Sequence, residues 1–337
     1  MTRTMRAARL TAPGHFEVHE HPVPQPAAGQ VLIALARAGL CGGDLQQYKN
    51  ASAALPFIPG HEGCGIVAEA PGQAALEGRR VVFDPQVHWC GRCEWCGQGH
   101  TEICPERRYL GAHAPGTFAQ YVVVPSDRLL TLPDAVGWDD AACVHALAGP
   151  VFASHRFHHE VGESVLVLGP GAAGLLFVQL ARQCLGASQV MLAGRSAHRL
   201  DLGRALGADV AVNTQQEDLA QRVAECTGGR GFDVIIETTG SVPLRQQLPA
   251  FAAPRARVLS YATGPIGWDS LKAMAVFGTT GATRGMRPAL DLIASGRIRT
   301  QQLVTHRYPL EGIQAAFDTA LSDHKGDFVK GVISLDP

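Results

Sequence analysis

The stretch that decides the fold is residues 164–174, which reads Ser164-Val165-Leu166-Val167-Leu168-Gly169-Pro170-Gly171-Ala172-Ala173-Gly174. An apolar run ends in a G-x-G-x-x-G pattern, and a helix-forming segment follows it directly. Such glycines let the chain turn sharply and bring backbone amides against a pyrophosphate, whose charge the helix N-terminus favours. A glycine-rich turn alone is common, but this context predicts a dinucleotide site at Gly169, Gly171, Ala172, Ala173 and Gly174.

Apolar runs alternate with helical stretches from this turn to residue 261. The expected strands are 165–168, 189–193, 209–212, 232–237 and 257–261, and the expected helices are 172–185, 196–206 and 218–226. Alternation at this spacing is typical of a parallel sheet with helices on both faces. We predict a doubly wound α/β domain over residues 155–285, with the loops after 234–237 and 258–261 lining its ligand cleft.

The rest of the chain has a different pattern. Short β-type runs at 30–35, 65–68, 80–83 and 118–124 are broken by Gly and Pro, which predicts an irregular, mostly antiparallel β domain over residues 1–154. A helix at 288–295 and a strand at 331–335 are expected to return residues 286–337 to that first domain. A length of 337 residues suits two domains.

The end of the second strand of the α/β domain indicates which dinucleotide binds. An NAD enzyme carries an acidic residue there, which accepts hydrogen bonds from the ribose hydroxyls. This chain has Gly194-Arg195-Ser196 instead, with Arg199 one helical turn later. The small residue leaves room for a 2′-phosphate and the guanidinium groups suit it, so NADP(H) is favoured over NAD(H). The alternative is that both arginines only form the solvated start of a helix.

The composition excludes several classes of function. Hydrophobic residues make up 46% of the chain and the formal net charge is −1, so the charge balance favours neither nucleic acid nor a membrane surface as a partner. No apolar run is long enough for a signal sequence or a membrane span, so we expect a cytoplasmic protein. Nine cysteines in such a protein point to metal binding more than to disulfides.

Four of those cysteines form one cluster, Cys90, Cys93, Cys96 and Cys104, with the spacing C-x2-C-x2-C-x7-C. Four thiolates this close in sequence can enclose one tetrahedral zinc ion and leave no open position, so the expected role is structural, in a lobe over residues 88–106. An iron–sulfur cluster is the competing interpretation, because Pro105 follows Cys104 and the first spacings match. The last spacing does not match, which favours zinc.

Two further motifs precede the cluster: Cys41-Gly42-Gly43-Asp44 and Pro59-Gly60-His61-Glu62-Gly63. Each alone has an ordinary explanation, a buried cysteine at a turn and a histidine after a turn. In this order, ahead of the cysteine cluster and the glycine motif, the chain resembles the zinc-containing branch of the medium-chain dehydrogenase/reductase family, which includes alcohol and polyol dehydrogenases. The resemblance implies a GroES-like, mostly β catalytic domain around an inserted Rossmann domain.

The resemblance also implies a catalytic zinc ion with Cys41 and His61 as ligands, and makes Glu62 a candidate ligand. Asp44 is implied to hydrogen-bond the zinc-bound imidazole of His61. The remaining ligand position of the family falls on His145, where the family usually has Glu or Cys, and Cys143 nearby is a second possibility. A helical His145 packed without metal is the alternative.

A second departure from the family affects the proton path. Many members carry Ser or Thr directly after C-G, and often His a few residues later, which together relay the alcohol proton. This chain has Gly43 and Gln46 there. A water chain, Tyr48 or Glu62 is expected to replace the relay, unless the reaction does not need it.

The expected reaction is hydride transfer between NADP(H) and a secondary alcohol, polyol or ketone whose oxygen is polarised by zinc. One alternative is an NADPH-dependent reductase of a polarised C=C or C=N bond. Another is a catalytically silent, zinc-stabilised dinucleotide binder, since fold and a structural metal do not imply turnover. The resemblance further implies a homo-dimer or homo-tetramer.

Overall fold

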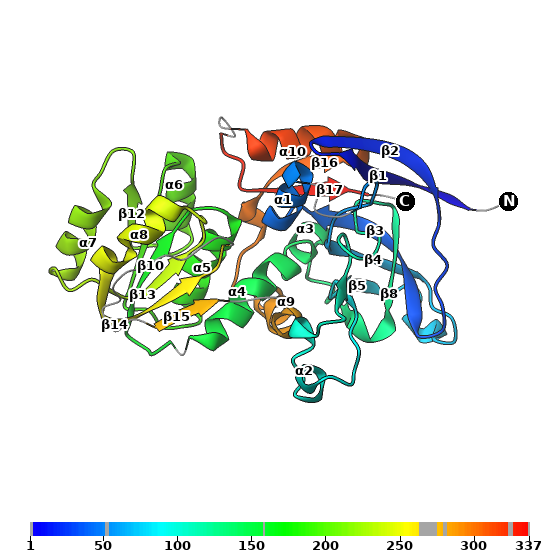
Figure 1. Ribbon diagram of the computed structural model, residues 1–337, viewed down its shortest axis with the longest axis horizontal. Helices are drawn as coiled ribbons and strands as arrows, with labels where there is room; N and C mark the ends of the chain where they lie inside the picture. The colour runs from blue at the N-terminus through cyan, green and yellow to red at the C-terminus, as the bar shows by residue number, and fades with distance from the viewer. Residues whose placement is uncertain are drawn as a thin grey trace. The chain divides into compact units, whose positions relative to one another are not determined.

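The computed structural model describes residues 3–50, 54–157, 159–262, 275–278, 282–322 and 326–335. The chain forms two compact units, shown in Figure 1: unit 1 comprises Met1–Ala148, Gly281–Gly296 and Thr300–Pro337, and unit 2 comprises Gly149–Thr280 and Arg297–Arg299. The first boundary falls inside helix α4 (Val144–Arg156), the helix that also contains the boundary expected at residue 154.

Unit 1 is built around a seven-stranded sheet with the strand order β16-β17-β3-β4-β5-β9, and β8 also pairs with β3. The strands are β3 (Gln30–Gly39), β4 (Glu62–Glu69), β5 (Arg80–Phe83), β8 (Tyr121–Pro125), β9 (Leu129–Thr131), β16 (Val304–Pro309) and β17 (Lys330–Ser334). The strands of this sheet pair antiparallel, except β16 with β17, which are parallel. The last strand therefore lies against β3, where Val332 is opposite Gly39.

Shorter elements surround this sheet. They are the hairpin of β1 (Thr4–Ala12) and β2 (His15–Pro22) and the helices α1 (Gly42–Asn50), α3 (Trp138–Ala141), α9 (Met286–Ala294) and α10 (Ile313–Leu321). The sequence patterns predicted α9 but missed the hairpin, α1 and α10. Helix α1 begins directly after Cys41, so whatever holds α1 also holds that cysteine.

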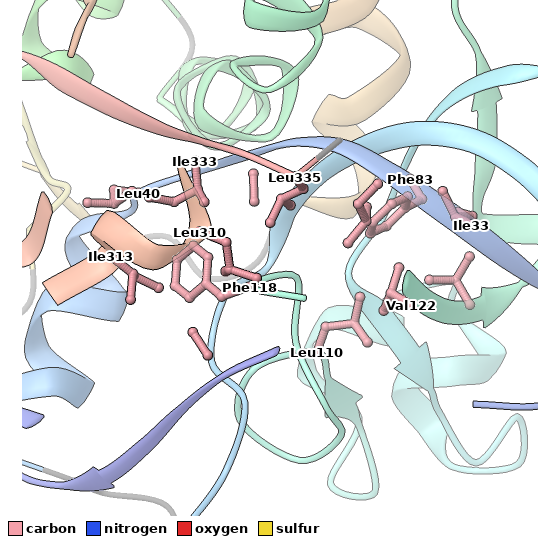
Figure 2. Packing of buried hydrophobic residues seen from close by; sticks show 14 of the residues in the cluster. Ile33, Leu40, Phe83, Leu110, Phe118, Val122, Leu310, Ile313, Ile333 and Leu335 are labelled. Atoms are coloured by element: carbon pink, nitrogen blue, oxygen red, sulfur yellow. The ribbon is translucent and has the colours of Figure 1, made fainter. Parts of the chain in front are cut away.

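The core of unit 1 fixes α1 through aromatic side chains. Figure 2 shows Phe118, Leu310 and Ile313 within one buried cluster, which also contains Tyr48 of α1. The Tyr48 ring stacks on Phe16 at 5.5 Å between centroids and lies 5.0 Å from the ring of Phe317 in α10. Burying one such side chain contributes about 1.5–3 kcal/mol, so this contact firmly anchors the helix.

Unit 2 is a six-stranded parallel sheet with the order β12-β11-β10-β13-β14-β15. Its strands are β10 (Ser164–Leu168), β11 (Gln189–Gly194), β12 (Val210–Asn213), β13 (Phe232–Glu237), β14 (Ala252–Ser260) and β15 (Ala275–Gly278). Its helices include α5 (Ala172–Gln183), α6 (Ala197–Ala205), α7 (Leu219–Thr227) and α8 (Val242–Phe251). The predicted doubly wound α/β fold is confirmed, and strand order reverses between β10 and β13, where such sheets bind ligands.

Strand β10 shows why these residues form the centre of that sheet. All five of its residues are buried, as expected for a parallel strand covered on both faces. Its neighbours β11 and β13 pair with it in regular register, Leu168 lying beside Ala193 and Glu237. The helices of the described residues include none with the length and apolar character needed to cross a bilayer.

Candidate functional sites

The first site brings together Cys41, His61 and Glu62, whose potential ligand atoms all lie within 4.8 Å of one another. Cys41 precedes α1, His61 precedes β4, and Glu62 is the first residue of β4. The pairing of β3 with β4 places Gly39 opposite Glu62, and a Cβ on Gly39 would lie 2.3 Å from Glu62 Oε2. A side chain at position 39 would therefore displace the carboxylate from this place.

Asp44 holds two of these potential metal ligands, His61 and Cys41, in place. Its Oδ1 lies 3.1 Å from His61 Nδ1, and its Oδ2 accepts a hydrogen bond of 3.0 Å from the backbone amide of Cys41. The side chain is 1% exposed. Contact at Nδ1 leaves Nε2 of His61 as the ring atom available to a metal.

The structure adds a residue that sequence reasoning missed, Lys330 at the start of β17. Its Nζ lies 2.6 Å from Glu62 Oε2 and donates a hydrogen bond of 3.0 Å to the carbonyl oxygen of Leu40. Burial alone would raise the pKa of Glu62, but Lys330, His145 and His61 together outweigh burial and lower it. A lysine opening an otherwise apolar strand was the only signal of this pair in the sequence.

His145 lies next to this group but outside the three-residue set. Its Nδ1 is 3.8 Å from Glu62 Oε1, and its ring meets that of His61 edge-on at 5.2 Å. Nδ1 is buried and has no hydrogen-bond partner among the described residues. Cys143 is fully buried, and burial raises the pKa of its thiol to about 12, which disfavours the thiolate a metal would bind.

The residues considered for a proton relay are placed as follows. Gly43 faces His61, because a Cβ there would lie 3.7 Å from the imidazole Cε1, an ordinary contact distance. Gln46 is exposed. The Tyr48 hydroxyl donates a hydrogen bond of 2.8 Å to Asp318 and also accepts one from Gln314. Burial and the Asp318 carboxylate raise the pKa of Tyr48 to about 12. The hydroxyl is therefore held by Asp318 and Gln314 and does not serve as the proton relay.

The donor set of this first site fits zinc. Sulfur, imidazole nitrogen and carboxylate oxygen are the three ligand types of protein zinc sites, and three protein ligands leave a fourth position for water or substrate. Asp44 supplies the carboxylate partner that metal-bound imidazoles usually have. An open position is what distinguishes a catalytic zinc site from a structural one.

The second site is the four-cysteine lobe. Cys90 follows β6 (Gln86–His88), Cys93 and Cys96 lie at and within the short helix α2 (Glu94–Gly97), and Cys104 precedes β7 (Arg108–Tyr109), the partner of β6. Cys90 Sγ is 3.9 Å from Cys96 Sγ and 3.6 Å from Cys104 Sγ. Four thiolates bound to one zinc ion at about 2.3 Å would stand about 3.8 Å apart, so the spacing suits a single closed ion.

Backbone amides prepare this lobe for anionic sulfur. The amide of Cys93 donates to Cys90 Sγ at 3.3 Å, and the amide of Cys90 donates to Cys104 Sγ at 3.4 Å. Hydrogen bonds from the backbone of Arg92 and Cys93 lower the pKa of Cys90 to about 6. These amides therefore stabilise the thiolate form of Cys90, whereas burial raises the pKa of Cys96 to about 12.

The third site is the glycine-rich turn between β10 and α5. Gly169 has a φ of +103°, and a Cβ there would lie 2.7 Å from Thr238 Oγ1. A Cβ on Gly174 would lie 1.9 Å from the carbonyl oxygen of Gly169. Gly171 is the N-cap of α5, which starts at Ala172, so the amides of Ala172 and Ala173 open the helix toward the turn.

The segment from Gly194, the last residue of β11, to Arg199 was expected to bind the 2′-phosphate, but Gly194 also has a packing role. A Cβ on Gly194 would lie 2.2 Å from Pro170 Cδ, so glycine is needed here for packing, independently of any phosphate. Ser196 caps α6 by accepting a hydrogen bond of 3.5 Å from the amide of Arg199. Arg195 is exposed, whereas burial lowers the pKa of Arg199.

Family models match two parts of the chain: the alcohol dehydrogenase GroES-like domain at residues 27–134 and the zinc-binding dehydrogenase domain at residues 172–295. With the two-unit fold and the donor sets above, the class is an oxidoreductase of the alcohol dehydrogenase type. The chain belongs to the zinc-containing medium-chain dehydrogenase/reductase family. The resemblance found in its motifs is thereby confirmed.

Several individual proteins are similar to this chain over nearly its whole length. D-arabitol-phosphate dehydrogenase from Enterococcus avium is 31% identical over 355 residues, covering 100% of this chain and 99% of that protein. A zinc-binding dehydrogenase from Sinorhizobium meliloti, solved with NADP, has a TM-score of 0.89 and 29% identity and covers 98% and 99% of the two chains. An alcohol dehydrogenase from Escherichia coli, solved with NADH, has a TM-score of 0.90 and 26% identity over the same fractions.

Proposed function

We propose that the protein transfers a hydride between NADP(H) and a secondary alcohol, polyol or the corresponding ketone. One zinc ion is held by Cys41, His61 and Glu62, and a second, structural ion by Cys90, Cys93, Cys96 and Cys104. The single observation that carries this proposal is the convergence of sulfur, imidazole and carboxylate donors within 4.8 Å. Similarity to a polyol-phosphate dehydrogenase supports the substrate class.

When bound, a zinc ion at this site would supply Lewis acidity and a nicotinamide cofactor would supply hydride chemistry. The chain's own residues prepare that chemistry. Asp44 holds the His61 ring through Nδ1 so that Nε2 is presented. Lys330 keeps Glu62 ionised, and an ionised carboxylate is the form that binds metal.

The decisive experiment counts zinc and measures turnover in the same preparations. We expect about two zinc equivalents in the purified protein, with NADPH oxidised on a panel of ketones. Cys41→Ala should lose one equivalent and all turnover but keep its fold. The matched variant Cys93→Ala should lose the other equivalent and destabilise the lobe. Unchanged zinc content in Cys41→Ala would refute the catalytic site.

The preference for NADP(H) rests on Arg195 and Arg199 and on the absence of an acidic residue at Gly194. Because Pro170 already requires glycine at position 194, the arginines carry this part of the proposal. We expect Arg195→Gln to lower kcat/KM for NADPH about tenfold or more while leaving the value for NADH unchanged. Equal effects on both cofactors would contradict a 2′-phosphate contact.

A second candidate function is reduction of a polarised C=C or C=N bond. The observation that favours it is a glycine, which carries no hydroxyl, at position 43 facing His61, together with the engagement of Tyr48 by Asp318. A Cβ at Gly43 would meet only the His61 ring, at an ordinary contact distance, so Gly43→Ser is the variant that introduces a hydroxyl there. If alcohols are the substrates, this variant should raise the rate of alcohol oxidation. Activity on enones or imines alone, unaffected by Gly43→Ser, would favour the second function.

Turnover on any of these substrates would also exclude the alternative that the protein is a catalytically silent dinucleotide binder.

We further propose that the protein forms a homo-dimer or homo-tetramer, as the family resemblance implies. Light scattering coupled to size-exclusion chromatography measures the assembly directly, and a monomer at micromolar concentration would contradict it.

A further inference from the structure

Unit 2 contains an ion pair that neither the glycine motif nor the zinc chemistry explains. Glu237 is the last residue of β13 and Arg245 lies in α8, and their side chains are 0% and 2% exposed. Arg245 Nε is 2.7 Å from Glu237 Oε2. Such charges are rarely buried without a specific arrangement to hold.

The carboxylate of Glu237 organises the loop that follows its own strand. Oε1 accepts hydrogen bonds from the amide and hydroxyl of Thr239, at 2.5 and 2.6 Å, and from the amide of Gly240 at 2.9 Å. Three donors from two consecutive residues fold this loop around one oxygen atom. The loop begins at the carboxyl end of β13, beside the point where strand order reverses.

The guanidinium of Arg245 reaches the neighbouring loop. Its Nη2 donates a hydrogen bond of 2.6 Å to the carbonyl oxygen of Ala262, two residues beyond β14. The amide of Tyr261 in turn donates to the carbonyl oxygen of Glu237 at 2.9 Å. One buried pair thus bridges the loop after β13 and residues 261–262, which follow β14 directly. Both segments belong to regions expected from the sequence to line the ligand cleft.

The first of these loops contacts the glycine-rich turn. The Thr238 hydroxyl shares its one proton between the carbonyl oxygens of Leu168 and Gly169, which lie 2.8 and 3.1 Å from Oγ1. A Cβ on Gly169 would lie 2.8 Å from Thr239 Cγ2, so the loop packs tightly on the turn. A shift of Thr238 or Thr239 would therefore move Gly169, the first glycine of the proposed cofactor site.

We propose that Glu237 and Arg245 form a positioning pair for the dinucleotide: they hold the loop after β13 and residues 261–262 after β14 and, through Thr238 and Thr239, the glycine-rich turn. The inference rests on the proposed use of a nicotinamide cofactor. Stability alone would not require these charges, because well-packed apolar residues serve as well in a core. The hydrogen bonds to Thr239, Gly240 and Ala262 indicate that the pair serves to fix the conformation of these segments.

The test measures dinucleotide affinity in the zinc-loaded protein well below its unfolding temperature. Arg245→Met removes the bridge, and Glu237→Gln keeps the size of the side chain but not its charge. We expect both variants to raise the dissociation constants for NADPH and NADH by about tenfold or more and by the same factor, since the pair lies on the shared part of the site. The KM for the second substrate at saturating cofactor should stay within about twofold.

Arg222→Met is the matched control, because Arg222 in α7 forms exposed ion pairs with Glu217 and Glu225 in the same unit. It should leave both dissociation constants unchanged. If Arg245→Met does not fold, Arg245→Lys keeps the charge but cannot bridge Glu237 and Ala262 with a planar fork, so its affinity should fall too.

Wild-type dissociation constants in folded Arg245→Lys or Glu237→Gln, even with a lowered unfolding temperature, would overturn the positioning role. A wild-type protein that binds neither NADPH nor NADH would instead refute the proposed function. The two failures are therefore distinguishable in one set of titrations.

Discussion

Glu62 and Glu237 are both glutamates at strand ends, both almost fully buried, and both paired with a cation, yet they are arranged for different purposes. Glu62 begins β4 in unit 1 and pairs with Lys330, 268 residues away in the chain. Glu237 ends β13 in unit 2 and pairs with Arg245, eight residues away. The contrast lies in what each carboxylate does with its second oxygen.

Oε1 of Glu237 is saturated by three hydrogen bonds from the following loop. Oε1 of Glu62 instead faces His145 at 3.8 Å, in a group that contains Cys41 and His61. A carboxylate saturated by backbone donors builds structure, whereas one that faces other potential ligands can bind a metal ion. The experiments that follow test whether the two glutamates differ in this way.

The largest effect is expected from Lys330→Met. Removing the lysine leaves the charge of Glu62 uncompensated in a buried site, which costs about 3–5 kcal/mol of unfolding free energy in protein stripped of metal. A zinc ion beside Glu62 replaces the missing positive charge, so the loss should shrink when zinc is present. Urea unfolding with and without a chelator measures both values.

Arg245→Met provides the contrast for this experiment. Its loss should be of similar size but independent of zinc, because no metal-ligand group adjoins Glu237 in the described part of the chain. Equal losses for Lys330→Met with and without zinc would remove Glu62 from the metal site and erase the distinction between the two glutamates.

Glu62→Gln should weaken zinc binding at the first site by about 10–100-fold, through loss of a charged ligand or near-ligand. Zinc in the cysteine lobe should be unaffected. Competition with a coloured chelator resolves the two ions by affinity. Glu237→Gln serves as the control and should retain both ions; loss of zinc from it would show that the assay reports general loosening.

His145→Ala sharpens the comparison further, because His145 faces the second oxygen of Glu62. If Glu62 is the ligand and His145 its neighbour, the variant should keep its zinc and lose about tenfold in kcat/KM. Loss of one zinc equivalent would instead make His145 the third ligand. Metal analysis and steady-state kinetics on one preparation decide between the two.

The smallest effect concerns Asp233 in β13, a partly exposed carboxylate that belongs to neither metal-ligand group found among the described residues. Burial would raise its pKa, but hydrogen bonds from Arg230 and Ser164 lower it to about 2. A folded-state pKa below the unfolded value means that the stabilisation is complete above about pH 4 and is lost as the pH falls toward 2.

With a partly exposed ion pair, the stabilisation from Asp233 should be about 1 kcal/mol. The difference in unfolding free energy between wild type and Asp233→Asn should therefore be present at pH 7 and decline between pH 4 and pH 3. A difference that grows on acidification would contradict the sign of the shift.

The features predicted from the sequence are those encoded by neighbouring residues. The strand, turn and helix around Gly169 follow from an apolar run and a glycine pattern within eleven residues. The four cysteines lie within fifteen residues, so their spacing alone indicated one ion. Strands β10 to β14 and helices α5 to α7 were predicted for the same reason.

The features missed are those that depend on residues far apart in the chain. Lys330 meets Glu62 only because β17 pairs with β3, a register that no local pattern reveals. Tyr48 was considered for a proton relay, but α10, which was not predicted, supplies Asp318 and Gln314 to its hydroxyl. Gly194 was interpreted as leaving room for a 2′-phosphate. The structure shows that it is also needed for packing against Pro170, a contact that the sequence did not reveal.

The contact between Gly194 and Pro170 also constrains how the proposed preference for NADP(H) could change over evolutionary time. An acidic residue at position 194, the simplest route toward NAD(H), would collide with the proline ring before it could meet a ribose. Replacement of Pro170 must come first or together with that change, so the order of the two mutations matters. Selection acting on position 194 alone would encounter a barrier set by its neighbour in the phosphate turn.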